Sequence, residues 1–272
     1  GFHYFLKYFV SMPQNFEIRV ISLKNQLDRR EKINNLFDNK NIRWSFFDAI
    51  SGKDIQPFLR MYDRKKRLQT PGYNLRDNEI ACFLSHREIW KECAQKNKNF
   101  LILEDDIKIN SNTSLDLIDS TNKIIEKVKK NHLFVRLGNL FKRDFFELGE
   151  ISTGLHLVRY KRDPSTTMGY ILSPNIASKL VLHSENFFTA VDDFLWRGWE
   201  HQCCLLDVYP NILFTSDIET PSAIGDRSKP KLTIIKKIKR EYFRALDTKK
   251  RSNYEKSIIL KLRKNENSPL NL

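Results

Sequence analysis

The sequence lacks any run of about eighteen apolar residues, which is the length that a membrane-spanning helix requires. Its opening stretch, FHYFLKYFV, is nine residues long, is interrupted by His3 and Lys7, and has no small-residue cleavage site after it. Internal repeats and low-complexity segments are also lacking. Apolar residues still make up 40% of the 272 residues, which is enough for a sizeable core. We therefore expect a globular, soluble protein of the cytoplasm.

Cysteine is scarce, and the spacing of the four cysteines along the chain does not favour a zinc site or a disulfide. None of the four cysteines belongs to a C-x-x-C pair, and Cys203 and Cys204 are adjacent, which is a poor geometry for an ordinary disulfide. Cys82 and Cys93 fall inside an apolar helical pattern, where a free thiol packs as a small hydrophobe. The sequence thus gives little support to thiol catalysis or to a structural zinc.

Acidic residues are too few to balance the basic ones, and the imbalance is local. The net charge is +14, but residues 229–264 contain fourteen Lys or Arg and three acids, a net charge of +11. The rest of the chain carries only about +3, in mixed sign. No recognisable RNA- or DNA-binding motif accompanies the charge, so we expect no nucleic-acid partner.

The basic segment has a helical pattern of its own. Ile235, Ile238, Tyr242 and Leu246 recur at three- and four-residue spacing, and the positions between them are basic: Lys236, Lys237, Lys239 and Arg240. This pattern predicts a basic amphipathic helix. Two uses remain open. Residues 229–264 either hold the protein at an anionic membrane surface, or pack their apolar stripe on the domain.

Apolar strands and amphipathic helices alternate along the preceding chain. The strand-like stretches include FEIRVISL, IRWSFFDAI and LILEDDI, and the helical ones include Leu27 to Phe37 and NEIACFLSHREIWKECAQ. Such alternation favours an α/β fold with a largely parallel sheet. We expect one such domain over residues 1–228 and a basic helical extension over residues 229–272.

Three consecutive acids end the most apolar of these strands. Glu104, Asp105 and Asp106 follow Phe100 to Leu103, and they repel one another unless a cation or a donor-rich ligand lies there. In α/β sheets ligands bind beyond the carboxyl ends of the strands. An acid cluster with no His or Cys beside it suits Mn²⁺ or Mg²⁺ better than zinc. The alternative is that these acids merely cap the following turn.

Several blocks, taken in order, resemble a known enzyme family. They are VISLKNQLDRR, FFDAISGKDI, LRDNEIACFLSHREIW, LILEDDI, RLGNL, MGYILSP and AVDDFLW. The chain resembles glycosyltransferase family 25, the bacterial lipooligosaccharide galactosyl- and glucosyltransferases to which collagen galactosyltransferases are related. The resemblance runs from Val20 to about Pro210 and leaves out the N-terminal stretch and the basic tail. It departs in detail, with Ser22 where Asn is common, Ser51 where Asp often precedes the Gly, and Ala81 where Gly is usual.

The resemblance implies a GT-A-type, Rossmann-like domain that binds a UDP-sugar. This resemblance implies that Asp106 is the direct metal ligand and that Glu104 and Asp105 contact the donor sugar. It also makes Glu104 a second candidate metal ligand. Further positions are implied to meet the donor: Ser22, Leu23, Arg29, Asp48, Ala49, Glu79, Ser85 and His86. Arg29 has the alternative of a helix surface cation, and His86 that of a satisfied core histidine.

An inverting transfer also needs a base for the acceptor hydroxyl. The segment AVDDFLWRGWEH offers Asp192, which matches the family's more constant acid, and Asp193 as second choice. The alternative for Asp192 is to cap a helix that begins at Phe194. His201 is a further candidate metal ligand, by likeness to a C-terminal His of some GT-A enzymes.

The resemblance therefore implies a metal-assisted enzyme that moves a hexose, galactose or else glucose, from a UDP-sugar to a lipooligosaccharide acceptor. Together with the basic tail, it places the enzyme on the inner face of the bacterial cytoplasmic membrane. Two other classes remain as alternatives. One is a catalytically idle membrane or assembly module acting through the tail, and the other is a nucleic-acid-binding protein.

Overall fold

An eight-stranded sheet lies at the centre of the computed structural model, which describes residues 14–38, 42–111, 116–141, 143–163, 165–215 and 233–264. The stretch FHYFLKYFV lies outside the described residues. The strand order is β2-β1-β3-β8-β5-β9-β7-β6. In chain order the strands are β1 (Glu17–Ser22), β2 (Trp44–Asp48), β3 (Phe100–Glu104), β5 (Phe134–Arg136), β6 (Phe145–Ser152), β7 (Leu155–Tyr160), β8 (Gly169–Leu172) and β9 (Leu206–Tyr209). A separate two-stranded sheet pairs β4 (Ile107–Ile109) with β10 (Leu213–Thr215).

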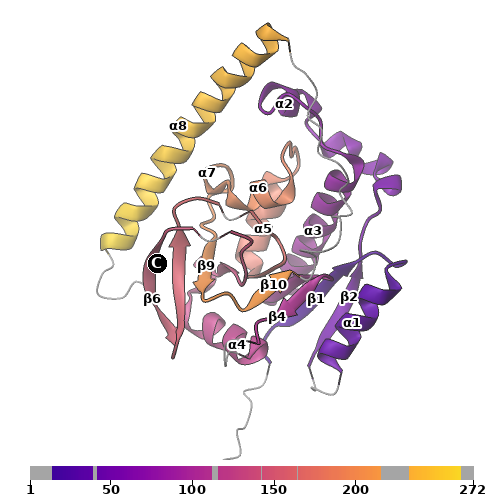
Figure 1. Ribbon diagram of the computed structural model, residues 1–272, viewed down its shortest axis with the longest axis vertical. Helices are drawn as coiled ribbons and strands as arrows, with labels where there is room; N and C mark the ends of the chain where they lie inside the picture. Colours follow the sequence, from indigo (N-terminus) through magenta and orange to yellow (C-terminus); the bar gives the residue numbers. More distant parts are fainter. Residues whose placement is uncertain are drawn as a thin grey trace, which may run out of the picture.

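Helices cover both faces of the large sheet (Figure 1). They are α1 (Leu27–Phe37), α2 (Arg64–Gln69), α3 (Asp77–Lys96), α4 (Leu117–Lys127), α5 (Pro174–His183), α6 (Val191–Trp196), α7 (Gly198–His201) and α8 (Ile234–Lys264), with 3₁₀ turns η1 (Gly52–Asp54), η2 (Gln56–Met61) and η3 (Lys130–His132). In β3, Phe100 and Ile102 pack with α3, α5 and α6, whereas Leu101 and Leu103 pack with α1 and α4. This two-sided burial explains the unbroken apolar run that leads to the acids.

The sheet is mixed but mostly parallel in direction, as expected: β7 and β8 run against the other six strands. β1 pairs parallel with β2 and β3, and β5 with β9, but β8 runs antiparallel between β3 and β5, and β7 runs antiparallel between β9 and β6. A strand buried on both faces has the same apolar pattern in either direction, so the sequence of β8 does not encode its orientation. The result is a mixed α/β fold that suits a Rossmann-like domain.

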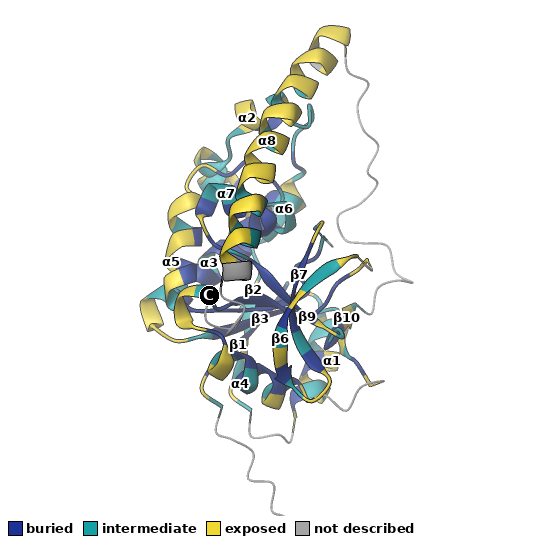
Figure 2. Ribbon diagram, turned by 90° about the vertical axis from the view of Figure 1, so that its left-hand side faces the viewer, coloured by how far each residue is buried: buried dark blue, intermediate teal, exposed yellow. Residues whose placement is uncertain are grey.

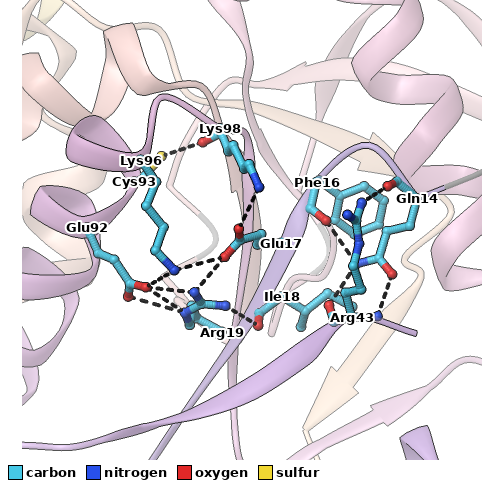
Figure 3. A network of polar contacts seen from close by, with 10 residues as sticks. All are labelled: Gln14, Phe16, Glu17, Ile18, Arg19, Arg43, Glu92, Cys93, Lys96 and Lys98. Carbon is cyan, nitrogen blue, oxygen red and sulfur yellow. Dashed lines mark hydrogen bonds and ion pairs between the residues drawn. The ribbon is translucent and has the colours of Figure 1, made fainter. Parts of the chain in front are cut away.

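A charged cluster ties the start of β1 to the end of α3 (Figure 3). Arg19 contacts Glu17 and Glu92, each at 2.6 Å, and Glu17 also contacts Lys96 at 3.3 Å and Lys98 at 3.2 Å. Burial raises the pKa of Glu17, but the three cations outweigh it and lower the pKa to about 2. Ionised Glu17 therefore stabilises the fold.

Glu17→Gln is expected to lower the free energy of unfolding by about 1–2 kcal/mol near neutral pH. The folded pKa of Glu17 lies below its ordinary value of 4.5, so its contribution is present above pH 4.5 and is lost as the pH falls toward 2. Urea denaturation at neutral and acidic pH measures this, with the exposed Glu31→Gln as the control. A deficit in Glu17→Gln that is the same at both pH values would contradict the assignment.

The long helix α8 docks on the domain from Asp247 onward, a part that we call the docked half. Arg197, which follows α6, pairs with Asp247 of α8 at 2.8 Å, and Arg159 of β7 pairs with Glu255 at 2.5 Å. Tyr254 lies against Gly198, where an added Cβ would come within 2.4 Å of the tyrosine Oη. This half of the helix is therefore fixed by two arginine–carboxylate pairs and one close approach.

The other half of α8 leaves its apolar stripe in solvent. Ile235 is 79% exposed, and Ile238, Tyr242 and Leu246 are exposed as well. Figure 2 shows the helix projecting beyond the domain with most of its length exposed. The expected alternative that this stripe packs on the domain is therefore wrong. No helix of the described ranges combines the length and apolarity needed to cross a membrane.

Candidate active site

The acid triplet lies at the carboxyl end of β3, in the turn that leads into β4. Glu104 ends the strand, and Asp105 and Asp106 form the turn before Ile107. The three side chains are 29%, 10% and 20% exposed, in that order. They are partly buried acids at the strand end, not freely exposed caps of a turn.

Arg29 of α1 faces the triplet. Its Nη1 lies 2.9 Å from Asp105 Oδ1 and 3.8 Å from Asp106 Oδ2. The expected alternative of a helix surface cation therefore does not fit Arg29, whose charge points at the acids. Arg29 brings one positive charge to three carboxylates, so the negative charge exceeds what it neutralises. An all-oxygen donor set of this kind fits a hard divalent cation.

Glu104 is held in its ionised form by groups from two other elements. The Thr167 hydroxyl donates a hydrogen bond to Oε1, and His86 Nε2 lies 3.7 Å from the same oxygen, beyond hydrogen-bond length. Burial raises the pKa of Glu104, but His86, Thr167 and Arg29 outweigh it and hold the pKa below the usual range. Thr167 was not found from the sequence, because only the pairing of β8 with β3 brings it to this strand end.

His86 completes a chain of buried polar groups. Trp90 Nε1–H donates to Tyr170 Oη at 2.8 Å, and Tyr170 Oη lies 2.8 Å from His86 Nδ1. The tyrosine hydroxyl already accepts from Trp90, so it donates its own hydrogen to Nδ1. Nε2 then carries the imidazole hydrogen and directs it at Glu104. His86 is thus a fully buried core residue whose Nε2 faces Glu104 without a hydrogen bond among the described residues, and a direct donor contact remains a prediction.

Tyr170→Phe is expected to lower the free energy of unfolding by about 2 kcal/mol, because Trp90 and His86 would lose a partner in a fully buried site. Denaturant unfolding measures this. Tyr209→Phe, at an exposed tyrosine of β9, is the matched control. Equal stability losses in the two variants would show that the buried hydroxyl does not have this role.

The candidate nucleotide residues gather where β1 and β2 end side by side. Ser22 and Asp48 are register partners, and Ala49 N–H donates to the Ser22 carbonyl at 3.0 Å. Arg30, which the sequence analysis missed, donates to the Ser22 carbonyl at 2.8 Å and pairs with Asp48 at 2.7 Å. It also donates to the Leu23 carbonyl at 3.2 Å. Arg30 thus fixes the strand ends that form this wall.

The other two α3 candidates have clear structural partners. Ser85 Oγ accepts from Ile50 N–H at 2.9 Å and donates to the Ala81 carbonyl at 2.8 Å. It thereby ties α3 to the segment after β2. Glu79 accepts from Arg76 N–H at 2.9 Å and so caps the start of α3. These contacts shape the wall of the site, and direct donor contacts remain predictions.

The two candidate bases lie in the first turn of α6. This helix begins at Val191, not at Phe194, so the expected capping position for Asp192 is wrong, although its carboxylate accepts from Asp193 N–H at 2.8 Å. The Asp193 side chain is 48% exposed and lies 3.9 Å from Arg197. Partial burial of this carboxylate raises its pKa to about 6, opposed by Arg197 and aided by Asp192.

Cys82 of α3 connects the triplet with Asp192. Burial raises the pKa of its thiol well above the ordinary value, and the charges of Glu104, Asp192, Glu79 and Asp106 raise it further. All four carboxylates therefore lie within electrostatic range of one sulfur atom. The structure thus brings candidate metal, donor and base residues from β3, α3 and α6 into one region.

Among the described residues, one group of three donors converges closely enough to hold a metal. Cys82, His86 and Glu104 each offer one ligand atom, and these atoms lie within 4.8 Å of one another. A thiol whose pKa is raised stays protonated and is a poor ligand. The three triplet carboxylates do not converge in this way, so a metal there would be held by one or two of them together with substrate phosphates, an arrangement that suits Mn²⁺ or Mg²⁺.

His201 does not fit the expected metal role. Its Nε2 lies 3.0 Å from the Phe194 carbonyl, and its Nδ1 accepts from Cys203 N–H at 3.2 Å. The ring is fully buried beside Phe134 and Phe194, and desolvation lowers its pKa to about 4. Both nitrogens are thus engaged in the core, which argues against a ligand.

Comparison with known proteins identifies the family. A family model described as "Glycosyltransferase family 25 (LPS biosynthesis protein)" matches residues 15–195, about two thirds of the chain. The chain belongs to glycosyltransferase family 25. The matched part of this family 25 chain includes the acid triplet, Arg29, Asp192 and Asp193.

Relatives within family 25 come from bacteria and animals. The chain is 23% identical to "Lipooligosaccharide biosynthesis protein lic2B" of Haemophilus influenzae over 80% of this chain and 85% of that protein. It is 39% identical to a "Glycosyltransferase 25 family member" of Drosophila melanogaster over 34% of this chain and 16% of the fly protein. It is 32% identical to "Procollagen galactosyltransferase 1-B" of Xenopus laevis over 37% of this chain and 18% of the frog protein. The match thus spans most of the bacterial relative and under a fifth of each animal protein.

Proposed function

We propose that this family 25 glycosyltransferase moves a hexose from a UDP-sugar to an oligosaccharide hydroxyl, with inversion at the anomeric carbon and in a GT-A-type domain. The observation that carries the proposal is the partly buried triplet Glu104-Asp105-Asp106, with Arg29 directed at it and Asp192 nearby across Cys82. Galactose is the first choice of donor sugar and glucose the second.

The donor would lie along the edge where β1, β2 and β3 end. In the proposed arrangement the wall of Ser22, Leu23, Asp48 and Ala49 receives the nucleoside, and Arg30 keeps that wall rigid. With a metal bound at Asp106, Arg29 would be placed to contact the diphosphate beside it. Glu104, ionised and fixed by Thr167 and His86, can accept hydrogen bonds from sugar hydroxyls.

Asp106, with Glu104 beside it, would hold Mn²⁺ or Mg²⁺. When bound, the cation supplies Lewis-acid stabilisation of the charge that develops on the departing diphosphate. The residues fit this group because the donor set is all oxygen and its negative charge exceeds that of Arg29.

The base acts on the acceptor side. A carboxylate of α6 takes the proton of the acceptor hydroxyl, the hydroxyl oxygen bonds to the anomeric carbon, and the bond from that carbon to the UDP oxygen breaks. Asp192 is the first choice because it matches the more constant acid of the family motif. Asp193 is the alternative, since a pKa of about 6 suits a base near neutral pH.

The acceptor is proposed to be a lipid-linked oligosaccharide, and α8 to rest on the inner face of the cytoplasmic membrane. The exposed stripe of Ile235, Ile238, Tyr242 and Leu246, with basic residues beside it, matches an anionic bilayer surface. Ile235→Asp/Ile238→Asp should lower binding to vesicles that contain phosphatidylglycerol by at least about tenfold. Leu182→Asp, at an exposed leucine of α5, is the control, and equal binding of both variants would contradict this role.

Calorimetric titration with UDP tests the proposed donor site. The expected result is UDP binding that requires Mn²⁺ and disappears with EDTA. Failure of UDP to bind with Mn²⁺ would overturn the enzymatic proposal. If the protein then still bound phosphatidylglycerol vesicles, a catalytically idle membrane module would describe it better than an enzyme.

A further inference from the structure

A basic hollow lies between the β6–β7 hairpin, α6 and α8, outside the triplet and the nucleotide wall. Its volume is about 480 Å³, within the range of small-molecule sites. Four cations line it: Arg143, Lys161, Arg162 and Arg251. The remaining lining residues are Trp196, Asp163 and Glu255. The hollow is thus large enough for a sugar unit and rich in positive charge.

Both acids of the hollow already have arginine partners deeper in the domain. Asp163 lies 3.2 Å from Nη1 of the buried Arg136, and Glu255 lies 2.5 Å from Nη2 of the buried Arg159. By contrast, none of the four lining cations forms an ion pair with a carboxylate in the part of the chain that the structure describes. The acids therefore do not cancel the positive charge of the hollow.

The hollow adjoins the candidate bases. Trp196 follows Asp193 by three residues and so lies one turn along α6, and the charge of Asp163 reaches Asp193. The chain after Asp163 leads within a few residues to Thr167, which bonds Glu104. A molecule in the hollow would thus lie beside α6.

We propose that this hollow binds an anionic saccharide, a sugar that carries a phosphate or a carboxylate, as part of the acceptor. Cations without carboxylate partners bind such groups by charge-assisted hydrogen bonds. Trp196 closes one side of the hollow, but it is 4% exposed and the Arg159 guanidinium covers its ring at 3.9 Å, so the cations are the main contacts for the ligand. Its role as an acceptor site rests on the proposed function, whereas binding of the anionic sugar does not.

The shape of the hollow favours a small saccharide over a bilayer surface as its ligand. Arg251 and Glu255 line it from the docked half of α8, whereas the apolar stripe proposed for the membrane lies on the projecting half. A recess walled by the docked helix suits a single charged sugar. The membrane surface is therefore the competing outcome of the test.

The test is binding of glucose 6-phosphate, measured by calorimetry without UDP or metal. Glucose, inorganic phosphate and phosphatidylglycerol vesicles are the comparison probes. The expected result is that glucose 6-phosphate binds more tightly than either glucose or phosphate. Arg162→Glu/Arg251→Glu should weaken this binding by at least about tenfold, since two attractive charges become repulsive. Lys65→Glu/Lys179→Glu, at exposed lysines of α2 and α5, makes the same change in net charge and should leave the affinity unchanged.

Three results would overturn the proposal. They are no binding of glucose 6-phosphate, binding no tighter than that of phosphate alone, and equal weakening by both double variants. Loss of vesicle binding in Arg162→Glu/Arg251→Glu, with no effect on sugar phosphate, would assign the cations to the membrane. Titration of the same samples with UDP and Mn²⁺ tests the donor site separately, so the two proposals can fail independently.

Discussion

Asp106→Asn is expected to lower the rate of hexose transfer by at least about a hundredfold while leaving the fold intact. The amide keeps the size of the carboxylate but removes the negative charge of the proposed direct metal ligand. Arg29 lies 3.8 Å from Asp106 and would remain paired with Asp105 at 2.9 Å, so the turn keeps its main anchor. Steady-state kinetics over a range of Mn²⁺ concentrations measures the effect, which should include a higher metal requirement.

Thermal unfolding separates this loss from a folding defect. Without ligands, Asp106→Asn should melt close to the wild type, because relief of repulsion among the acids offsets the weaker contact with Arg29. With UDP and Mn²⁺ the wild type should gain stability and the variant should not. Asp119→Asn, on the surface of α4, is the control for charge removal. A wild-type transfer rate in Asp106→Asn would show that the triplet has no role in the mechanism.

Asp192→Asn is expected to lower the turnover number by about 10²–10⁴-fold with little change in the KM of the donor, because the amide cannot accept the hydroxyl proton. Asp193→Asn should lose about tenfold or less, since its carboxylate is nearly half exposed and already faces Arg197. The two variants remove the same charge at adjacent positions and therefore control for each other. The reverse order of effects would assign the base to Asp193.

The pH dependence gives a second criterion. The pKa of Asp193 is raised to about 6, so Asp193 is protonated below that value. If it were the base, the turnover number would fall about tenfold per pH unit below 6. If Asp192 is the base, the decrease in turnover number at acidic pH does not depend on the titration of Asp193 and should persist in Asp193→Asn. A decrease in turnover number near pH 6 that disappears in Asp193→Asn would contradict the choice of Asp192.

The acid triplet could be placed from the sequence because its strand has an unambiguous pattern. Four apolar residues followed by three acids mark the end of a doubly buried strand, and the structure ends β3 at Glu104. Ser22 and Asp48 were named from the family resemblance, and the structure shows them as register partners where β1 and β2 end together. The family itself was identified from its ordered motifs and is confirmed by the match to residues 15–195.

Contacts that depend on strand direction could not be found in this way. Thr167 reaches Glu104, and Tyr170 reaches His86, only because β8 runs antiparallel beside β3. The position of His201 in the core likewise depends on tertiary packing around Phe194. The basic hollow is assembled from β7, α6 and α8, which are far apart in the chain, so no local spacing marks it.

The most direct test of the proposed function is a transfer assay with purified protein and a lipid-linked oligosaccharide acceptor. UDP-galactose, UDP-glucose and their N-acetylated counterparts would each be supplied with Mn²⁺ or with EDTA. The expected result is Mn²⁺-dependent formation of one glycosylated product, with UDP-galactose the preferred donor and product formation lost in Asp106→Asn. Transfer that continues in EDTA and in Asp106→Asn would contradict the central role of the triplet.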